Sequence, residues 1–160
     1  MCVSFFVGDY MNKYIDLALK EAKKAYKKGD VPVGCVIVKD NKVISKAHNN
    51  KENKGIATYH AELLAINKAC KRLKTWHLDN CVLYTTMEPC IMCSGAIIQS
   101  RIKKIVYILD NKEFGNIKNN DIFKSNKFEI VQINNEESLN LIQSFFKIKR
   151  NLNVPRETFK

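Results

Sequence analysis

The stretch CVLYTTMEPCIMCSGAIIQ, residues 81–99, carries the pattern on which the predicted fold depends. Its first six residues are apolar or β-branched, which is typical of a buried strand. Pro89 ends this strand, and the residues that follow, to about Gln99, are expected to form a helix. Cys90 would begin that helix, with Cys93 one turn further on. Both sulfur atoms would then lie on one side of the helix.

A second stretch upstream supplies further polar groups. His60-Ala61-Glu62 is expected to open another helix, whose apolar face continues to Leu73. If the two helices begin side by side, His60, Cys90 and Cys93 would surround one ion. A helix N-terminus lowers the pKa of a thiol, and the thiolate is the form that binds metal. Nitrogen and sulfur ligands together suit zinc, and three protein ligands leave one position open for water, as in catalytic zinc sites.

The pattern H-x-E followed by P-C-x-x-C indicates a zinc-dependent nucleobase deaminase. Glu62 is the group expected to move protons, from water to a ring nitrogen and then to the leaving amine. Two other interpretations of the cysteine pair stay open. C-x-x-C after a strand also occurs in redox sites, but that interpretation explains neither His60 nor Glu62. A structural zinc site would need a fourth ligand. The other histidines, His48 and His77, have no suitable partner spacing.

Helices and strands alternate along the rest of the chain. We expect a helix over residues 14–26 ended by Gly29-Asp30, strands over 31–38, 42–47, 105–109 and 128–131, a polar loop over 48–58, and an amphipathic C-terminal helix that includes residues 139–146. The order α-β-β-α-β-α-β-β-α predicts an α/β fold with three layers, α-β-α, in which helices flank a five-stranded sheet. The segment 110–127 is long enough for a parallel crossover, which would make the sheet mixed, but its Asn, Lys and Gly content also fits an irregular loop.

The composition limits the class of protein. The 160 residues fit one domain, expected over residues 11–152, with a dispensable extension over 1–10 and a tail over 153–160. The opening residues lack the features of a secretion signal, and no apolar run approaches the ~18 residues of a membrane span. We therefore expect a cytoplasmic protein with no membrane partner, whose remaining internal cysteines (Cys35, Cys70 and Cys81) are small buried apolar residues. The net charge of +11 favours a nucleic acid partner or reflects a composition biased toward Lys and Asn.

From Met11 to about Arg150, the chain resembles the bacterial tRNA adenosine deaminases of the TadA type, which belong to the cytidine deaminase-like superfamily. The motifs that carry the resemblance are Val31-Pro32-Val33-Gly34, His60-Ala61-Glu62, Glu88-Pro89-Cys90-Ile91-Met92-Cys93, Ser100-Arg101-Ile102 with Val106-Tyr107, and Phe145-Phe146 followed by basic residues up to Arg150. The resemblance implies the cytidine deaminase-like fold and conversion of adenosine to inosine at the wobble position of a tRNA anticodon. It also implies a homodimer with one zinc ion per subunit.

The resemblance further implies which residues contact the substrate. Asn49 would contact the target nucleoside, Val31 and Pro89 would line its pocket, and the backbone of Ala61 would bind the edge of the base. After the fourth strand the family pattern is shifted by a residue, which leaves Asp110 and Asn111 as alternatives for one contact with the anticodon stem-loop. The other residues expected to contact RNA are basic or aromatic: Lys51, Lys54, Lys112, Phe145, Phe146, Lys147, Lys149 and Arg150.

Two rival functions remain at this stage. A deaminase of a free base or nucleoside, such as guanine, cytosine or cytidine, would use the same zinc core. An RNA-binding module with a purely structural metal would show the same ligands without turnover. The basic charge and the motif at the C-terminus favour the RNA substrate. An anticodon loop also suits this chemistry, because sequence-specific RNA recognition favours loops whose bases are already unstacked.

Overall fold

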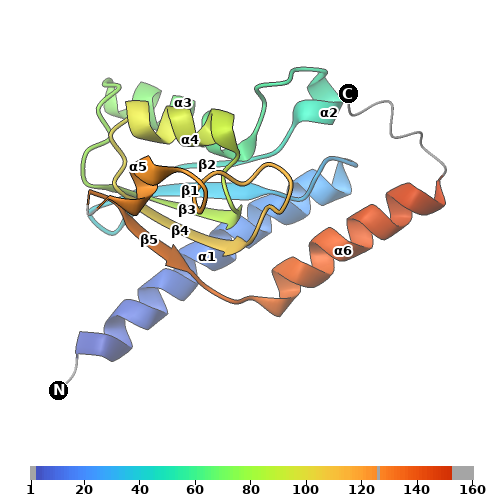
Figure 1. The fold of residues 1–160 in the computed structure, drawn as a ribbon, viewed down its shortest axis with the longest axis horizontal. Coiled ribbons are helices and arrows are strands. Elements are labelled where there is room, and N and C mark those ends of the chain that lie inside the picture. Colours follow the sequence, from blue (N-terminus) through green and yellow to red (C-terminus); the bar gives the residue numbers. More distant parts are fainter. Residues whose placement is uncertain (1–2, 126, 153–160) are drawn as a thin grey trace.

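The computed structural model describes residues 3–125 and 127–152 (Figure 1). Its helices are α1 (Val3–Lys27), α2 (Lys51–Lys54), α3 (Ala61–Leu73), α4 (Ile91–Gln99), α5 (Asp121–Lys124) and α6 (Glu136–Asn151). Its strands are β1 (Gly34–Lys39), β2 (Lys42–His48), β3 (Cys81–Met87), β4 (Lys104–Leu109) and β5 (Glu129–Gln132). Among these helices, none combines the length and the apolar character that a membrane crossing requires.

The strands form one mixed sheet in the order β2-β1-β3-β4-β5. β1 pairs antiparallel with both β2 and β3, whereas β3, β4 and β5 are parallel to one another. The five-stranded mixed sheet confirms the predicted fold class. The parallel pairing of β4 with β5 also decides between the two interpretations of residues 110–127, because it requires a crossover. This crossover contains the short helix α5.

Helices cover both faces of the sheet, with α1 and α6 on one face and α3 and α4 on the other (Figure 1). Successive residues of a strand point to opposite faces, and β1 shows this directly. Cys35 and Ile37 belong to the core beneath α3 and α4, whereas Val36 and Val38 belong to the core beneath α1. The three-layer prediction is therefore confirmed. Cys81 is also buried in the core, as predicted, whereas Cys70 is only half-buried and packs against the core.

The predicted strand over residues 31–38 is wrong at its beginning, because β1 starts at Gly34. The N–H of Val33 donates to the carbonyl of Val31 at 2.8 Å, and Pro32 has no N–H, so these residues form a tight turn rather than a strand. Gly34 then passes directly beneath α1. A Cβ atom at position 34 would overlap backbone atoms of α1, which explains why this position is glycine.

Two other boundaries differ from the prediction. The first helix begins at Val3 rather than at residue 14, since no proline interrupts the backbone of residues 3–13. The segment 48–58, predicted as a polar loop, contains the single turn α2. Whether residues 1–10 are dispensable stays a prediction, and the predicted tail over residues 153–160 lies outside the described residues.

Candidate metal centre

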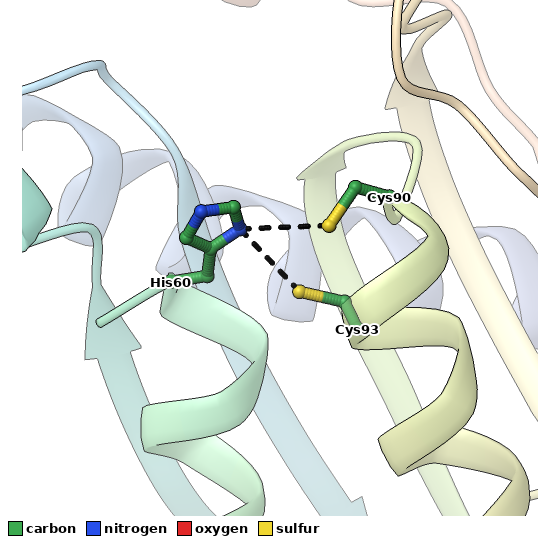
Figure 2. Close-up of side chains that lie close together, drawn as sticks. All are labelled: His60, Cys90 and Cys93. Carbon is green, nitrogen blue, oxygen red and sulfur yellow. Dashed lines mark hydrogen bonds between the residues drawn. The ribbon is translucent and has the colours of Figure 1, made fainter. Parts of the chain in front are cut away.

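His60 and Cys90 occupy equivalent positions in the fold. Each is the N-cap residue of its helix, α3 for His60 and α4 for Cys90, and each has an extended backbone. The two helices run side by side on one face of the sheet, with their N-termini together (Figure 2). Cys93 lies in the first turn of α4 and is buried. The expected arrangement of two helix N-termini around one site is therefore present.

The three side chains come together as a metal site requires. His60 Nδ1 lies 3.7 Å from Cys90 Sγ and 3.5 Å from Cys93 Sγ (Figure 2). The ligand atoms of the group all lie within 4.8 Å of one another. For comparison, a tetrahedral zinc ion with ordinary bond lengths would place a nitrogen and a sulfur ligand about 3.6 Å apart. The group could thus hold such an ion with little movement of the side chains.

The cysteines form a coupled pair even before metal binds. The hydrogen bond from Cys93 outweighs burial and, with the contact to His60, lowers the pKa of Cys90 to about 4. The same hydrogen bond to Cys90, together with burial, raises the pKa of Cys93 well above its ordinary value. The hydrogen bond to Cys90 also raises the pKa of His60, against the effect of burial. One thiolate is therefore present at neutral pH, and a bound cation would draw off the second proton.

Glu62 lies in the first turn of α3 with only 4% of its surface exposed. The thiol of Cys93 donates to its Oε2 at 3.6 Å, which places the carboxylate directly beside the metal group. Burial raises the pKa of Glu62 above its ordinary value. A carboxyl group whose pKa is raised in this way is suited to take up a proton and release it again.

Two of the residues predicted to bind the nucleoside, Ala61 and Pro89, adjoin the metal ligands in the chain. Asn49 precedes Asn50, whose backbone N–H donates to the carbonyl of Tyr59, the neighbour of His60, at 3.0 Å. Asn49 is buried, and its backbone N–H donates to the carbonyl of Val33 at 2.9 Å. Val31 is half-buried, and Pro89 is buried next to Cys90. Ala61 is the first residue of α3, where a backbone N–H has no partner within the helix.

The residues predicted to contact RNA divide into two groups. Lys51 and Lys54 lie on α2, close in sequence to Asn49. Lys112 and α6 line a surface cavity of about 760 Å³. The residues around this cavity are Lys112, Ile142, Gln143, Phe146, Lys147 and Arg150. Its lining thus includes three of the predicted basic residues and one of the predicted aromatic residues.

Several predicted RNA contacts have other partners in the structure. Phe145 is buried against Tyr26, whereas Phe146 is 42% exposed, so of the two phenylalanines only Phe146 is accessible to a base. Lys149 extends over the ring of Phe145. Asp110 pairs with Lys118 at 2.7 Å.

Sequence reasoning missed Glu88, a buried carboxylate beside the metal group. Glu88 accepts backbone hydrogen bonds from Asn111, Ile117 and Lys118, at 3.0–3.2 Å. These bonds hold the segment 111–118 against the start of α4, where the N–H of Asn116 also donates to the carbonyl of Pro89. The contact of Asn111 with Glu88 is thus made by its backbone N–H and not by its side chain. The only signal in the sequence was the position of Glu88 within the motif E-P-C.

Sequence reasoning also missed Asp30, which it took only as the end of the first helix. Asp30 is fully buried, and its Oδ1 accepts a hydrogen bond from Asn49 Nδ2 at 2.7 Å.

The two other histidines lie elsewhere, as expected. His48 contacts Glu21 at 2.9 Å, and His77 stacks on Trp76.

Comparison with known proteins gives a consistent result. The sequence profile of a family described as MafB19-like deaminase matches residues 10–150. A tRNA-specific adenosine deaminase of Aquifex aeolicus is 46% identical over 145 residues, which cover 86% of this chain and 95% of that protein. The chain spans between half and two thirds of the length of several other relatives of the same description.

Two solved structures extend the comparison to the fold. A tRNA:A34 deaminase that edits A to I at the wobble position superposes with a TM-score of 0.73 at 30% identity, over 81% of this chain and 99% of that chain. A guanine deaminase from Bacillus subtilis superposes with a TM-score of 0.61 at 32% identity, over 85% of this chain and 93% of that chain. The chain is therefore similar both to enzymes that act on tRNA and to one that acts on a free base.

Proposed function

Because the chain belongs to the MafB19-like deaminase family and is 46% identical to a tRNA-specific adenosine deaminase, we propose that it converts adenosine to inosine at the wobble position of a tRNA anticodon. The observation that carries the proposal is the group His60, Cys90 and Cys93 with the buried carboxylate of Glu62 beside it. Three ligands and one proton-transferring group are what hydrolytic removal of an amine from a base requires.

His60, Cys90 and Cys93 are proposed to hold one zinc ion per subunit. The mixed nitrogen and sulfur donors favour zinc over magnesium or calcium, which prefer oxygen ligands. When bound, zinc supplies an activated water for attack on carbon 6 of adenine. The protein's part is to keep the three ligand atoms at the observed spacing and to leave the fourth position open.

Glu62 is proposed to move the protons of the reaction. Its carboxylate takes a proton from the attacking water, delivers it to nitrogen 1 of the ring, and then assists transfer of a proton to the departing amine. Water adds to carbon 6, the carbon–nitrogen bond breaks, and the products are inosine and ammonia. The raised pKa of Glu62 supports this role, because the group must be able to carry a proton near neutral pH.

The target nucleoside is proposed to be bound by four residues, namely Asn49, Val31, Ala61 and Pro89. The positions of Ala61 at the start of α3 and of Pro89 next to the N-cap of α4 support this assignment. The Asn49 side chain can bind polar atoms of the nucleoside, Val31 and Pro89 offer apolar surface to the base, and the N–H of Ala61 can donate to the base edge.

The proposed substrate is the anticodon stem-loop rather than a free nucleoside. Lys112, Lys147 and Arg150 around the cavity at α6 provide positive charge for phosphates, and the exposed ring of Phe146 offers a surface on which a base can stack. Lys51 and Lys54 on α2 add further positive charge. Tight RNA binding over such a surface would depend strongly on salt.

The active form is proposed to be a homodimer in the cytoplasm. Exposed apolar side chains near the metal group support the dimer, since Ile91 on α4 is 73% exposed and Phe114 is 63% exposed. The metal-binding cysteines require a compartment that keeps thiols reduced, which supports the location. Sedimentation at micromolar concentration would test the dimer: a protein that stays monomeric would contradict it.

The experiment that tests the function compares substrates. The purified zinc-loaded protein is incubated with an anticodon stem-loop that carries adenosine at the wobble position, and separately with guanine, cytidine and free adenosine. We expect inosine in the stem-loop, detected by sequencing, and no product from the free compounds. Deamination of guanine without deamination of the stem-loop would instead support the rival function, which the similarity to guanine deaminase makes the main alternative.

The variant Glu62→Ala tests the mechanism in the same assay. It is expected to retain zinc and to lose turnover by about 10²–10⁴-fold, the usual contribution of a general acid–base group. An RNA-binding module with a purely structural metal would show no turnover in either protein.

A further inference from the structure

We infer that Asp30 is a positioning residue of the active site, which holds Asn49 and the segment around α2 in place through a single carboxylate. The inference rests on the proposed function, because it concerns the pocket for the nucleoside. Asp30 is fully buried, yet it lies in no helix or strand. Its two oxygen atoms accept five hydrogen bonds from four residues that come from three parts of the chain.

The Oδ1 atom faces the residues proposed to bind the nucleoside. It accepts from the Nδ2 of Asn49 at 2.7 Å and from the backbone N–H of Val31 at 3.0 Å. The bond to Asn49 joins two buried side chains separated by 19 positions in the sequence. Asn49 and Val31, both proposed to contact the nucleoside, therefore donate hydrogen bonds to the same oxygen atom.

The Oδ2 atom stabilises the beginning of α2. It accepts from the backbone N–H groups of Glu52 at 2.9 Å and Asn53 at 3.2 Å, and from the side chain of Asn53 at 3.1 Å. The N–H groups in the first turn of a helix have no partner within the helix, and an N-cap side chain normally accepts from them. Here the N-cap residue Asn50 makes no such bond. Asp30, which is more than 20 positions away in the sequence, provides the acceptor instead.

The chemistry of the carboxylate determines which way the Asn49 amide is turned. All five contacts of Asp30 come from N–H groups, so the carboxylate acts only as an acceptor. It therefore accepts a hydrogen bond from the amide Nδ2 of Asn49, whereas the amide oxygen in that place would be repelled by the carboxylate oxygen. Asn49 keeps its Oδ1 and one N–H for another partner. Asp30 thus selects one of the two amide orientations and fixes what Asn49 can offer to the nucleoside.

The substitution Asp30→Asn tests this inference, because it keeps the size of the side chain but adds N–H donors opposite the existing ones. We expect kcat/KM for the anticodon stem-loop to fall by about 10- to 100-fold, as for loss of a hydrogen bond to a charged group, with unchanged zinc content. The effect should act through Asn49. In the background of Asn49→Ala, the same substitution should therefore change kcat/KM by less than about threefold.

Two outcomes of this double-mutant cycle would overturn the inference. Asp30→Asn could leave kcat/KM unchanged, or its effect could multiply in full with that of Asn49→Ala, as expected of a residue that only stabilises the fold. The conservative variant Asp30→Glu keeps the carboxylate and should retain more activity than Asp30→Asn. Ser45→Ala is the matched control, since it removes a buried hydrogen bond of 2.7 Å that joins β2 to α3 without touching Asn49. It should leave kcat/KM within about twofold.

A measurement on the unmodified protein separates this inference from the proposed function. Hydrogen exchange should show the N–H groups of Glu52 and Asn53 protected, although both residues lie on the surface of a single turn. Exchange of these groups at the rate of an unstructured loop would overturn the inference, whatever the activity. A protein that protects them but leaves the stem-loop unmodified would instead contradict the proposed function alone.

Discussion

Gly115 packs directly against the carboxylate of Glu88, so closely that a Cβ atom at position 115 would overlap Glu88 Oε2. Glu88 in turn holds the segment 111–118 by three backbone hydrogen bonds. Gly115 also pairs with Cys90 in an isolated β-bridge. The glycine therefore allows the crossover between β4 and β5 to lie against the metal group.

The substitution Gly115→Ala should consequently displace this segment. We expect it to lower the free energy of unfolding by about 1–3 kcal/mol, which is typical of overpacking, and to reduce turnover of RNA more than metal content. Denaturant titration and zinc analysis of the same preparation would measure both effects. Gly95→Ala is a suitable control, because a Cβ atom at position 95 of α4 meets no atom within 4 Å. That change should be neutral or stabilise the helix by about 0.5–1 kcal/mol, and an equal loss in both variants would contradict the explanation.

The proposed metal ligands give a second prediction. Cys90→Ser and His60→Ala should each remove most of the bound zinc and abolish deamination, whereas Cys70→Ser, which changes a cysteine outside the group, should retain both. Atomic emission analysis of the purified proteins would measure zinc per chain. Pure protein that is fully active with no bound metal would contradict the assignment.

The metal-free protein should also show an unusually reactive thiol. Because the pKa of Cys90 is lowered to about 4, its thiolate is present from pH 5 upward, whereas Cys93 stays protonated. We expect alkylation at Cys90 with a rate that varies little between pH 6 and 8 in the metal-free protein, and protection when zinc is bound. Mass spectrometry after brief labelling would identify the site. A rate that rises tenfold per pH unit over this range would show an ordinary thiol.

Local patterns in the sequence were sufficient to predict the metal group. His60, Cys90 and Cys93 lie at helix beginnings that proline, apolar periodicity and motif spacing indicate within a few residues. The sequence pattern likewise predicted all five strands, but it began the first strand at residue 31, whereas β1 begins at Gly34. That boundary depends on a hydrogen bond from Val33 to Val31. Residue preferences do not reveal this bond.

The supporting carboxylates were not predictable in the same way. Asp30 reaches donors at positions 49–53, and Glu88 reaches donors at positions 111–118. A single acidic residue between two elements has no periodicity and looks like an ordinary exposed turn residue. Its role becomes visible only when the sheet has placed the distant segments beside it. Strand order is a similar case, because a list of strands does not specify which of them are neighbours.

Another buried carboxylate, Glu21 on α1, gives a prediction about pH. Burial alone would raise its pKa, but hydrogen bonds from Lys24 and His48 outweigh burial and hold the pKa below the ordinary value of 4.5. A lowered pKa in the folded state contributes stability above pH 4.5, and this contribution is lost as the pH falls through the folded value. Glu21→Gln should therefore be less stable than the unmodified protein at pH 7, and the difference should shrink below pH 4. Thermal unfolding across this range would measure it, and a difference that grows on acidification would contradict the ion pairs.

The basic cavity at α6 gives the final prediction. The double substitution Lys112→Ala with Lys147→Ala should weaken binding of the anticodon stem-loop, because both side chains line the cavity proposed to receive phosphates. Each lost phosphate contact should also reduce the slope of log affinity against log salt by about 0.7 for single-stranded RNA. The matched control is Lys42→Ala with Lys71→Ala, which removes the same charge at the start of β2 and the end of α3, away from the metal group. Fluorescence anisotropy between 50 and 300 mM salt, roughly the range in which counterion release is measurable, would give both slopes. Equal slopes for the two double variants would show that net charge alone, and not this cavity, determines RNA binding.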